Sequence, residues 1–296
     1  MKLSAFAFLF LTFAALAANA EPQADSAPAL RAGYASMAGR LADSPFGRPL
    51  ELESREAGNR VQGAAYAVVD RPFAELRSGL RGPRQWCDVL ILHLNVKDCR
   101  AAPGGGGLAL YLGRKRPEPP EEAQRLDFAY RALADEPDFM QTVLEADRGP
   151  AGTHDYRIRF EASPLDATHS FVALSYSYAY GIAARIALNA YLATVGAGKV
   201  GFTVIGQQAD GGPRYVGGLR GIAERNVMRY YLAIEAHLGA LSSPPEARAE
   251  TSMRDWFAAT ERYPLQLHEL SRSDYLEMKR AEYRRETLAL RAASSR

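Results

Sequence analysis

A chain of 296 residues with 47% hydrophobic residues is long enough to bury a sizeable core in one large domain or two small ones. Its 36 lysine and arginine residues nearly balance 34 aspartate and glutamate residues, and no strongly basic face stands out. This balance excludes the charge pattern of a nucleic-acid-binding protein, so we expect no nucleic-acid partner.

The first 20 residues have the layout of a cleaved secretory signal. Lys2 precedes an apolar stretch at residues 5–17, and the small residues Ala18 and Ala20 flank Asn19. The stretch is short for a bilayer-spanning helix, which needs about 20 apolar residues. We therefore expect cleavage after Ala20 and a periplasmic or secreted protein, with a retained membrane anchor as the alternative.

Export bears on the two cysteines, Cys87 and Cys99. Two thiols in an exported chain usually pair, whereas a metal site needs more ligands at closer spacing. An unbroken helix would separate these two residues by about 18 Å, but the Cα atoms of a disulfide lie within about 7 Å. A disulfide therefore predicts that the chain folds back, and we place the turn at residues 93–95. The alternative is two separate buried thiols.

Residues 21–50 are rich in Ala, Ser, Pro and Gly, and we interpret them as a loosely structured lead-in with a short helix around residues 30–41. From Val61 the stretch VQGAAYAVVD predicts a strand. The D-x-P-F step at residues 70–73 then opens two short helices, the second of which carries Trp86. A return strand that ends at Cys99 follows them.

The middle of the chain is rich in predicted strands, at residues 108–115, 139–145, 155–162 and 169–181. In the third of these strands, apolar and charged residues alternate, with Tyr156 and Phe160 on the apolar face. The last strand places Tyr176, Tyr178 and Tyr180 on one face. Tyrosine rings in register can line a cavity whose polar anchors are hydroxyls, or they can form cross-strand pairs that stabilise a sheet. Both readings stay open.

A helix at residues 182–194 and a strand at residues 199–207 precede the longest internal helix, at residues 219–241. Asn226 lies within the apolar stripe of this helix. A buried amide without a hydrogen bond costs about 1–3 kcal/mol, so we expect Asn226 to bond to the protein, a water or a ligand. Two further helices, at residues 246–262 and 274–291, form a C-terminal extension that covers residues 242–296.

This order of elements resembles the START-like (helix-grip) superfamily of lipid-transfer domains, polyketide cyclases and related binders of hydrophobic ligands. The segment from Tyr66 to Trp86 and the helix at residues 219–241 carry the resemblance, which covers about residues 51–241. It implies an α+β fold in which a curved antiparallel sheet grips the long helix around an apolar cavity. The residues that the resemblance implies as ligand-binding are Phe160, Tyr176, Tyr178, Tyr180, Asn226 and Tyr230.

The sequence offers no catalytic motif beside this resemblance. The five histidines form no H-x-x-x-H or H-E-x-x-H pair, and no G-x-S-x-G motif is present. We therefore assign no catalytic residue, no metal and no cofactor, and we predict a binder of a hydrophobic small molecule or lipid.

Two alternatives to this function stay open. One is an enzyme on the same scaffold, either cyclase-like or hydrolase-like. The other is a protein that makes transient contact with a membrane or an envelope partner, and an exposed stripe along Met253, Trp256 and Tyr263 would favour it.

Overall fold

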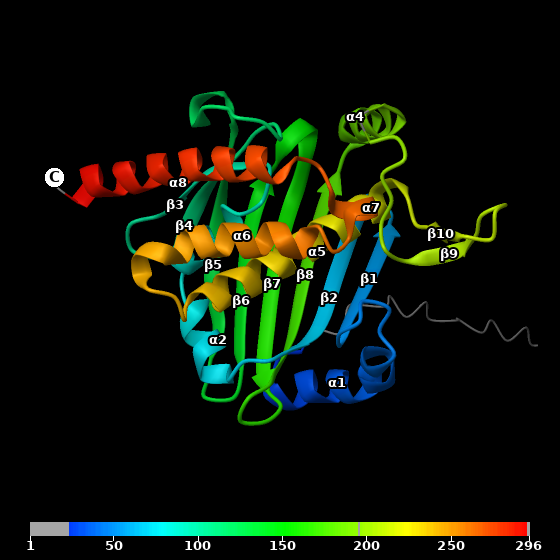
Figure 1. Cartoon of the computed structure of the whole chain (residues 1–296), viewed down its shortest axis with the longest axis horizontal. Coiled ribbons are helices and arrows are strands. Elements are labelled where there is room, and N and C mark those ends of the chain that lie inside the picture. The colour runs from blue at the N-terminus through cyan, green and yellow to red at the C-terminus, as the bar shows by residue number, and fades with distance from the viewer. Residues whose placement is uncertain (1–23, 195, 295–296) are drawn as a thin grey trace, which may run out of the picture.

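The computed structural model describes residues 24–194 and 196–294, so the expected signal at residues 1–20 lies outside the described residues. Eight strands form one antiparallel sheet (Figure 1). In spatial order they are β1 (Leu50–Ala57), β2 (Arg60–Val69), β8 (Ser170–Tyr180), β7 (Thr153–Pro164), β6 (Met140–Arg148), β5 (Gln124–Asp135), β4 (Gly107–Leu112) and β3 (Val96–Ala101). After β2 the chain crosses to the far edge of the sheet and returns strand by strand until β8 pairs with β2.

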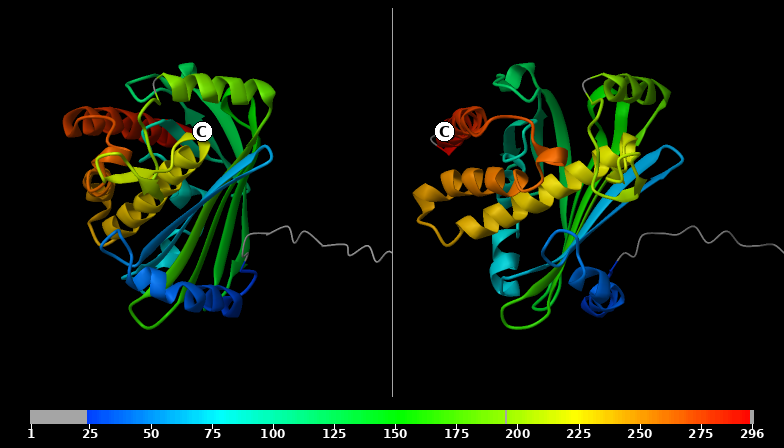
Figure 2. Two further views of the ribbon diagram at one scale, coloured as in Figure 1. Left: turned by 90° about the vertical axis from the view of Figure 1, so that its right-hand side faces the viewer. Right: turned by 45° about the vertical axis from the view of Figure 1, so that its right-hand side comes forward.

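Helices cover both faces of this sheet. The long helix α5 (Gly218–Ala240) packs against β1, β2 and β8, and α1 (Ala27–Ala42) packs on the opposite face, as the right-hand view of Figure 2 shows. The remaining helices on the α5 side are α2 (Phe73–Gly79), α3 (Pro83–Leu90), α6 (Arg248–Thr260), α7 (Pro264–Leu267) and α8 (Arg272–Ser294). The strand–helix–helix–sheet–long-helix order confirms the expected α+β helix-grip arrangement.

The alternation of side chains along β8 connects the two layers. Leu174 and Tyr176 join the large core on the α5 side, whereas Phe171 and Ala173 join a smaller core on the α1 side. The Phe171 ring lies 5.2 Å from the ring of Tyr34 in α1. Because successive strand residues point to opposite faces, a strand covered on both sides is apolar along most of its length.

The glycine in β2 explains how closely α5 approaches the sheet. A Cβ atom at Gly63 would lie 2.8 Å from the backbone oxygen of Ala223 in α5, which is closer than packed atoms tolerate. Any larger residue at this position would push the helix away from the strand. The absence of a side chain therefore sets the spacing of the first half of α5 from the sheet.

The disulfide expected from the sequence is confirmed. Cys87 in α3 bonds to Cys99 in β3, and their Cα atoms lie 5.3 Å apart. Between them the chain turns back at residues 91–95, where the turn was expected. The bond therefore fastens the second short helix to the edge strand of the sheet.

Two strands of the sheet were not expected from the sequence, namely β1 and β5. Both alternate apolar and polar residues, as the buried Leu126 and Phe128 of β5 show, but charged residues dominate their outer faces. The segment before the sheet is also more regular than a loose lead-in, because α1 runs for 16 residues from a Ser26 N-cap whose hydroxyl accepts from the Ala29 amide.

An insertion separates β8 from α5. It contains α4 (Ile182–Ala193), β9 (Val204–Gln207) and β10 (Pro213–Tyr215), and the last two form their own two-stranded sheet. The strand expected at residues 199–207 is therefore shorter than predicted and does not join the main sheet. The backbone amides of Phe202 and Thr203 donate instead to the buried Glu224 carboxylate of α5, at 2.6 and 2.9 Å.

The C-terminal helices cover their own apolar stripe. Met253 and Trp256 are buried, and the Trp256 ring stacks on Tyr275 of α8 at 5.0 Å. Tyr263 is partly buried against the rings of Phe46 and Phe202. The stripe is therefore internal packing, and the exposed surface that would favour an envelope partner is absent at these positions.

None of the helices in the described part of the chain combines the length and apolar character that a bilayer crossing requires.

Candidate ligand site between the sheet and helix α5

Four tyrosines meet between the sheet and α5, and we call them the tyrosine cluster: Tyr156, Tyr176, Tyr178 and Tyr230. Tyr156 stacks on Tyr178 with 5.3 Å between ring centroids, and Tyr176 of β8 lies 5.5 Å from Tyr230 of α5. Tyr176 pairs across the sheet with Ile158, and Tyr156 lies in the register shift of β7 between His154 and Arg157, where its ring contacts Tyr176 and Tyr178.

The other sequence-predicted site residues occupy different places. Phe160 is buried in the same core, where its ring meets Trp86 of α3 edge to face at 5.9 Å. Tyr180 lies at the end of β8, and its hydroxyl donates to the Glu56 carboxylate of β1 at 2.7 Å. The structure thus brings Tyr176, Tyr178 and Tyr230 together, whereas Phe160 and Tyr180 lie to either side of them.

A line of polar contacts crosses this interior. The hydroxyls of Thr153 and Tyr156 lie 2.7 Å apart. Polar contacts that influence the pKa values of the groups continue from Tyr156 to Tyr176, from Tyr176 to the Asn226 amide, and from Asn226 to the His93 ring. Burial raises the pKa of Tyr156, Tyr176 and Tyr230, so their hydroxyls keep their protons and act as neutral donors and acceptors. Asn226 therefore finds a partner within the protein.

His93 ends this line on the side of α3, and sequence analysis did not assign it to the site. Its ring is 5% exposed and lies 5.2 Å from the Tyr230 ring. Burial, together with the positive charges of Arg229 and Lys279, lowers the pKa of His93 well below its usual value, so the imidazole is neutral. A neutral buried imidazole at this position offers one donor and one acceptor.

The two nitrogens of His93 differ in their partners. Nδ1 accepts from the Asn95 amide at 3.2 Å, which leaves the proton on Nε2. The Asn226 amide approaches the ring closely enough to influence its pKa, but no described group lies within hydrogen-bonding geometry of Nε2. A buried N–H without an acceptor is uncommon in folded proteins, and it marks a place where a ligand atom could accept.

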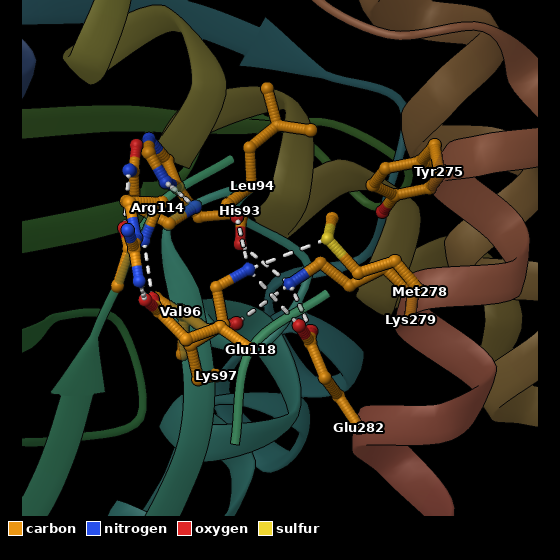
Figure 3. A network of polar contacts seen from close by, with 12 residues as sticks. His93, Leu94, Val96, Lys97, Arg114, Glu118, Tyr275, Met278, Lys279 and Glu282 are labelled. Carbon is orange, nitrogen blue, oxygen red and sulfur yellow. Dashed lines mark hydrogen bonds and ion pairs between the residues drawn. The ribbon is translucent and has the colours of Figure 1, made fainter. Parts of the chain in front are cut away.

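A charged junction lies on the other side of His93 (Figure 3), formed by Lys97, Lys279 and Glu282. The Lys279 ammonium donates to the backbone oxygens of His93 and Val96 at 2.7 and 2.8 Å, and to Glu282 at 2.7 Å. Lys97 donates to Glu282 at 3.1 Å. These three side chains, which we call the α8 junction, are buried and fasten α8 to the loop that holds His93.

A concavity of about 490 Å³ lies away from the tyrosine cluster, among α2, α3, α5 and α6. Its lining includes Asp88, Met253 and His237, whose Nε2 lies 3.0 Å from the backbone oxygen of Gly79. Because His237 and its neighbours hold helices together here, the interior beside α5 remains the stronger candidate for a ligand site. Among the described side chains, no group of three or more His, Cys, Asp or Glu is arranged to hold a metal ion.

Comparisons with known proteins find only weak similarity to solved structures. No family model and no curated protein matches the sequence. Among solved structures, the chain is similar to a START superfamily protein from Mycobacterium smegmatis, with 13% identity and a TM-score of 0.30 over 41% of this chain and 78% of that one.

Two further solved structures show similarity of the same order. Norcoclaurine synthase from Thalictrum flavum shares 13% identity with a TM-score of 0.31, over 48% of this chain and 82% of that one. A protein from Arthrobacter aurescens shares 13% identity with a TM-score of 0.34, over 65% of this chain and 92% of that one. At these scores, the fold assignment stands on the order and packing of the elements themselves.

Proposed function

We propose that this protein is exported and binds a hydrophobic small molecule or lipid between the sheet and α5. The observation that carries the proposal is the tyrosine cluster, which presents apolar rings together with neutral polar groups in a buried space. Ligand sites of this class are mostly apolar and aromatic, with a few polar groups that orient the ligand. The Nε2–H group of His93 is one such group, since it has no acceptor among the described residues.

A bound molecule has to displace rings that contact one another in this structure. Tyr176 touches three other tyrosines, so the apolar part of a ligand enters only if some of these side chains change rotamer. The ligand then replaces the ring–ring contacts that are broken, so the apolar surface of the tyrosine rings stays buried. The proposal therefore includes a rearrangement of the tyrosine cluster on binding.

Export is supported by two features of the chain. The Ala-x-Ala pattern before Glu21 fits a signal cleavage site, and the Cys87–Cys99 disulfide suits an oxidising compartment. Mass spectrometry of the protein isolated from the cell envelope or medium tests this part. A mature chain that begins at Glu21 and contains no free thiol is expected, and a chain that retains residues 1–20 in the cytoplasm would contradict it.

The binding itself is tested with Trp86, which packs against Phe160 in the interior. The chain has two tryptophans, so a Trp256→Phe variant leaves Trp86 as the sole donor of fluorescence energy. The methyl ester of cis-parinaric acid, a fluorescent apolar probe, is expected to quench Trp86 with saturation. A Trp86→Phe variant titrated in parallel reports on Trp256, whose Nε1–H donates to the backbone oxygen of Arg229 in α5.

Mass spectrometry of organic extracts from natively purified protein complements this measurement by searching for the natural ligand. A stoichiometric apolar compound is the expected result. Empty extracts together with no saturable quenching of Trp86 would overturn the proposal.

Catalysis on the same scaffold is a second candidate, and the neutral imidazole of His93 favours it. The buried Nε2–H group beside the Tyr230 ring can donate a hydrogen bond to an oxygen of a bound molecule that gains negative charge during a reaction. Incubation of the extracted compound with fresh protein tests this role. A change in mass with the wild-type chain and none with His93→Gln would support catalysis, and an unchanged compound in both would leave binding alone.

A further inference from the structure

Three cationic side chains contact one carboxylate at the edge of the interior. We call these four residues, Lys115, Lys199, Arg229 and Glu269, the Glu269 cluster. Lys115 from the loop after β4, Lys199 from the segment after α4, and Arg229 from α5 all bond to Glu269. Arg229 donates to the Glu269 carboxylate at 3.0 Å and to the Leu267 backbone oxygen at 3.3 Å. Both lysines make their ion pairs with this same acid, so the two lysines alone exceed its charge.

Burial makes this excess of positive charge costly. The side chains of Arg229 and Glu269 are 3% and 8% exposed, whereas both lysines are 26% exposed. Like charges repel more strongly where water is partly excluded. In agreement, burial and the charge of Arg229 lower the pKa of Lys115 to about 8. Burial opposes ionisation of Glu269, but the cations outweigh it and lower its pKa to about 2.

The Glu269 cluster borders the tyrosine cluster along α5. Arg229 directly precedes Tyr230 in the helix, and its charge acts on both Tyr230 and His93. It adds to the lowering of the His93 pKa and partly offsets the increase that burial causes in the Tyr230 pKa. One turn earlier in α5, the buried Arg225 donates to the backbone oxygen of Val200, next to Lys199. The positive charges therefore extend from the partly exposed Lys115 and Lys199 to the buried Arg229, beside the tyrosine cluster.

From this arrangement we propose that the ligand is an acidic amphiphile, with its apolar chain in the tyrosine cluster and its single anionic head on Lys115, Lys199 and Arg229. The inference rests on the proposed function and adds the head group to it. A carboxylate or a phosphate monoester would accept hydrogen bonds from two ammonium groups and a guanidinium, and it would offset the positive charge that Glu269 leaves over. The His93 ring lies 5.2 Å from Tyr230 and within reach of the charge of Arg229.

The experiment compares cis-parinaric acid with its methyl ester, which has the same chain but no charge. Titration of the full mature chain at low salt is expected to give a Kd about tenfold lower for the acid, because charge-assisted hydrogen bonds in a partly buried site are worth about one decade in affinity. The double variant Lys115→Gln, Lys199→Gln is expected to remove this preference while the affinity for the ester stays within about twofold.

The matched control is Arg116→Gln, which removes an exposed positive charge next to Lys115. It is expected to change neither affinity by more than about twofold, because exposed charges are screened by salt. Unchanged ester binding in the lysine variant shows that this variant is folded.

The outcomes separate the inference from the proposed function. If the wild-type chain binds both probes equally and the lysine variant does likewise, the head-group inference is wrong while the binding function stands. If neither probe binds, the proposed function itself fails.

The source of the anion is resolved by competition with oleate and with oleoyl lysophosphatidic acid. Displacement of the bound probe by either supports the inference and identifies the head as a carboxylate or a phosphate. Displacement by neither compound, at concentrations below micelle formation, would overturn it.

Discussion

The interior beside α5 and the α8 junction both bury polar groups, but the two regions differ in how completely those groups are hydrogen-bonded. In the junction, the Lys97 and Lys279 ammonium groups each have three partners, and the Glu282 carboxylate accepts from both. In the interior, the line from Thr153 to Asn226 ends at His93, whose Nε2 has no acceptor among the described residues. A complete network fixes one arrangement of the chain, whereas an incomplete one leaves a group for a ligand.

His93 belongs to both regions. Its backbone oxygen is fixed by Lys279, and its ring faces Tyr230. The comparison therefore assigns a structural role to the junction and a binding role to the interior, with the junction holding His93 in position. Each of the following predictions tests one side of this comparison.

Removal of Glu282 is expected to have the largest effect. Glu282→Leu leaves two buried ammonium groups without their carboxylate, and breaking a buried ion pair in this way costs about 3–5 kcal/mol. Urea unfolding of the variant measures this loss. The triple variant Lys97→Met, Lys279→Met, Glu282→Leu removes all three charges and should lie within about 1 kcal/mol of the wild type. Equal losses in both variants would show that the ion pairs are not what fixes the junction.

Loss of the disulfide ranks second. Closure of a loop of this length contributes about 3 kcal/mol by restricting the unfolded chain, so Cys87→Ala, Cys99→Ala should lose about that amount of unfolding free energy. The same loss is expected when the wild-type protein is reduced before unfolding. A variant as stable as the wild type would mean that the packing of α3 against β3 needs no covalent bond.

The hydrogen bonds of the tyrosine cluster should matter less. Tyr176→Phe removes a buried hydroxyl and its polar contact with the Asn226 amide, which costs about 1–2 kcal/mol in urea unfolding. Tyr34→Phe on the opposite face of the sheet is the control, because Tyr34 contributes a ring contact with Phe171 there. A change of less than about 0.5 kcal/mol is expected for it. Equal losses of unfolding free energy in Tyr176→Phe and Tyr34→Phe would show that the tyrosine cluster is ordinary core packing.

The smallest expected effect is a pH dependence near the end of α8. Burial, reinforced by Asp88 and Asp98 and opposed by Arg84, raises the pKa of Glu286 to about 8. A carboxyl whose pKa is raised in the folded state stabilises the fold below its unfolded pKa, and this contribution is lost as the pH rises through about 8. Over the single pH unit from 7 to 8, the unfolding free energy should fall by less than about 1.4 kcal/mol.

Glu286→Gln is expected to flatten this pH dependence, since the amide does not titrate. Urea unfolding at several pH values compares the two chains. A slope that persists in the variant would assign the effect to other buried groups, with Asp88 the first to examine because burial also raises its pKa.

Much of the fold was accessible from residue patterns. The Cys87–Cys99 pair predicted the fold-back, the alternation around Tyr176 predicted the inward face of β8, and the apolar stripe of residues 219–241 predicted α5. These features depend on neighbours within one element, where the period of the side chains is set by the backbone. The strands β1 and β5 were missed because each buries only two residues at alternate positions, Leu50 and Leu52 in β1 and Leu126 and Phe128 in β5, which is too short a pattern to stand out.

The site was predictable only in part, for the same reason. Tyr176, Tyr178, Asn226 and Tyr230 follow from periodicity, because each lies on the inward face of its own strand or helix. His93 occupies a turn without periodicity, so its burial against Tyr230 had no signal along the chain.

The sequence by itself determined the elements and their inward faces, because these depend on residues a few positions apart. Only the tertiary structure decided which distant groups meet: Lys115, Lys199, Arg229 and Glu269 come from four separate segments. Lys97 and Glu282 at the junction come from two more, β3 and α8. The physical reason is that charge balance and hydrogen-bond satisfaction are properties of groups close in space, and chain crossings that bring them together leave no local pattern.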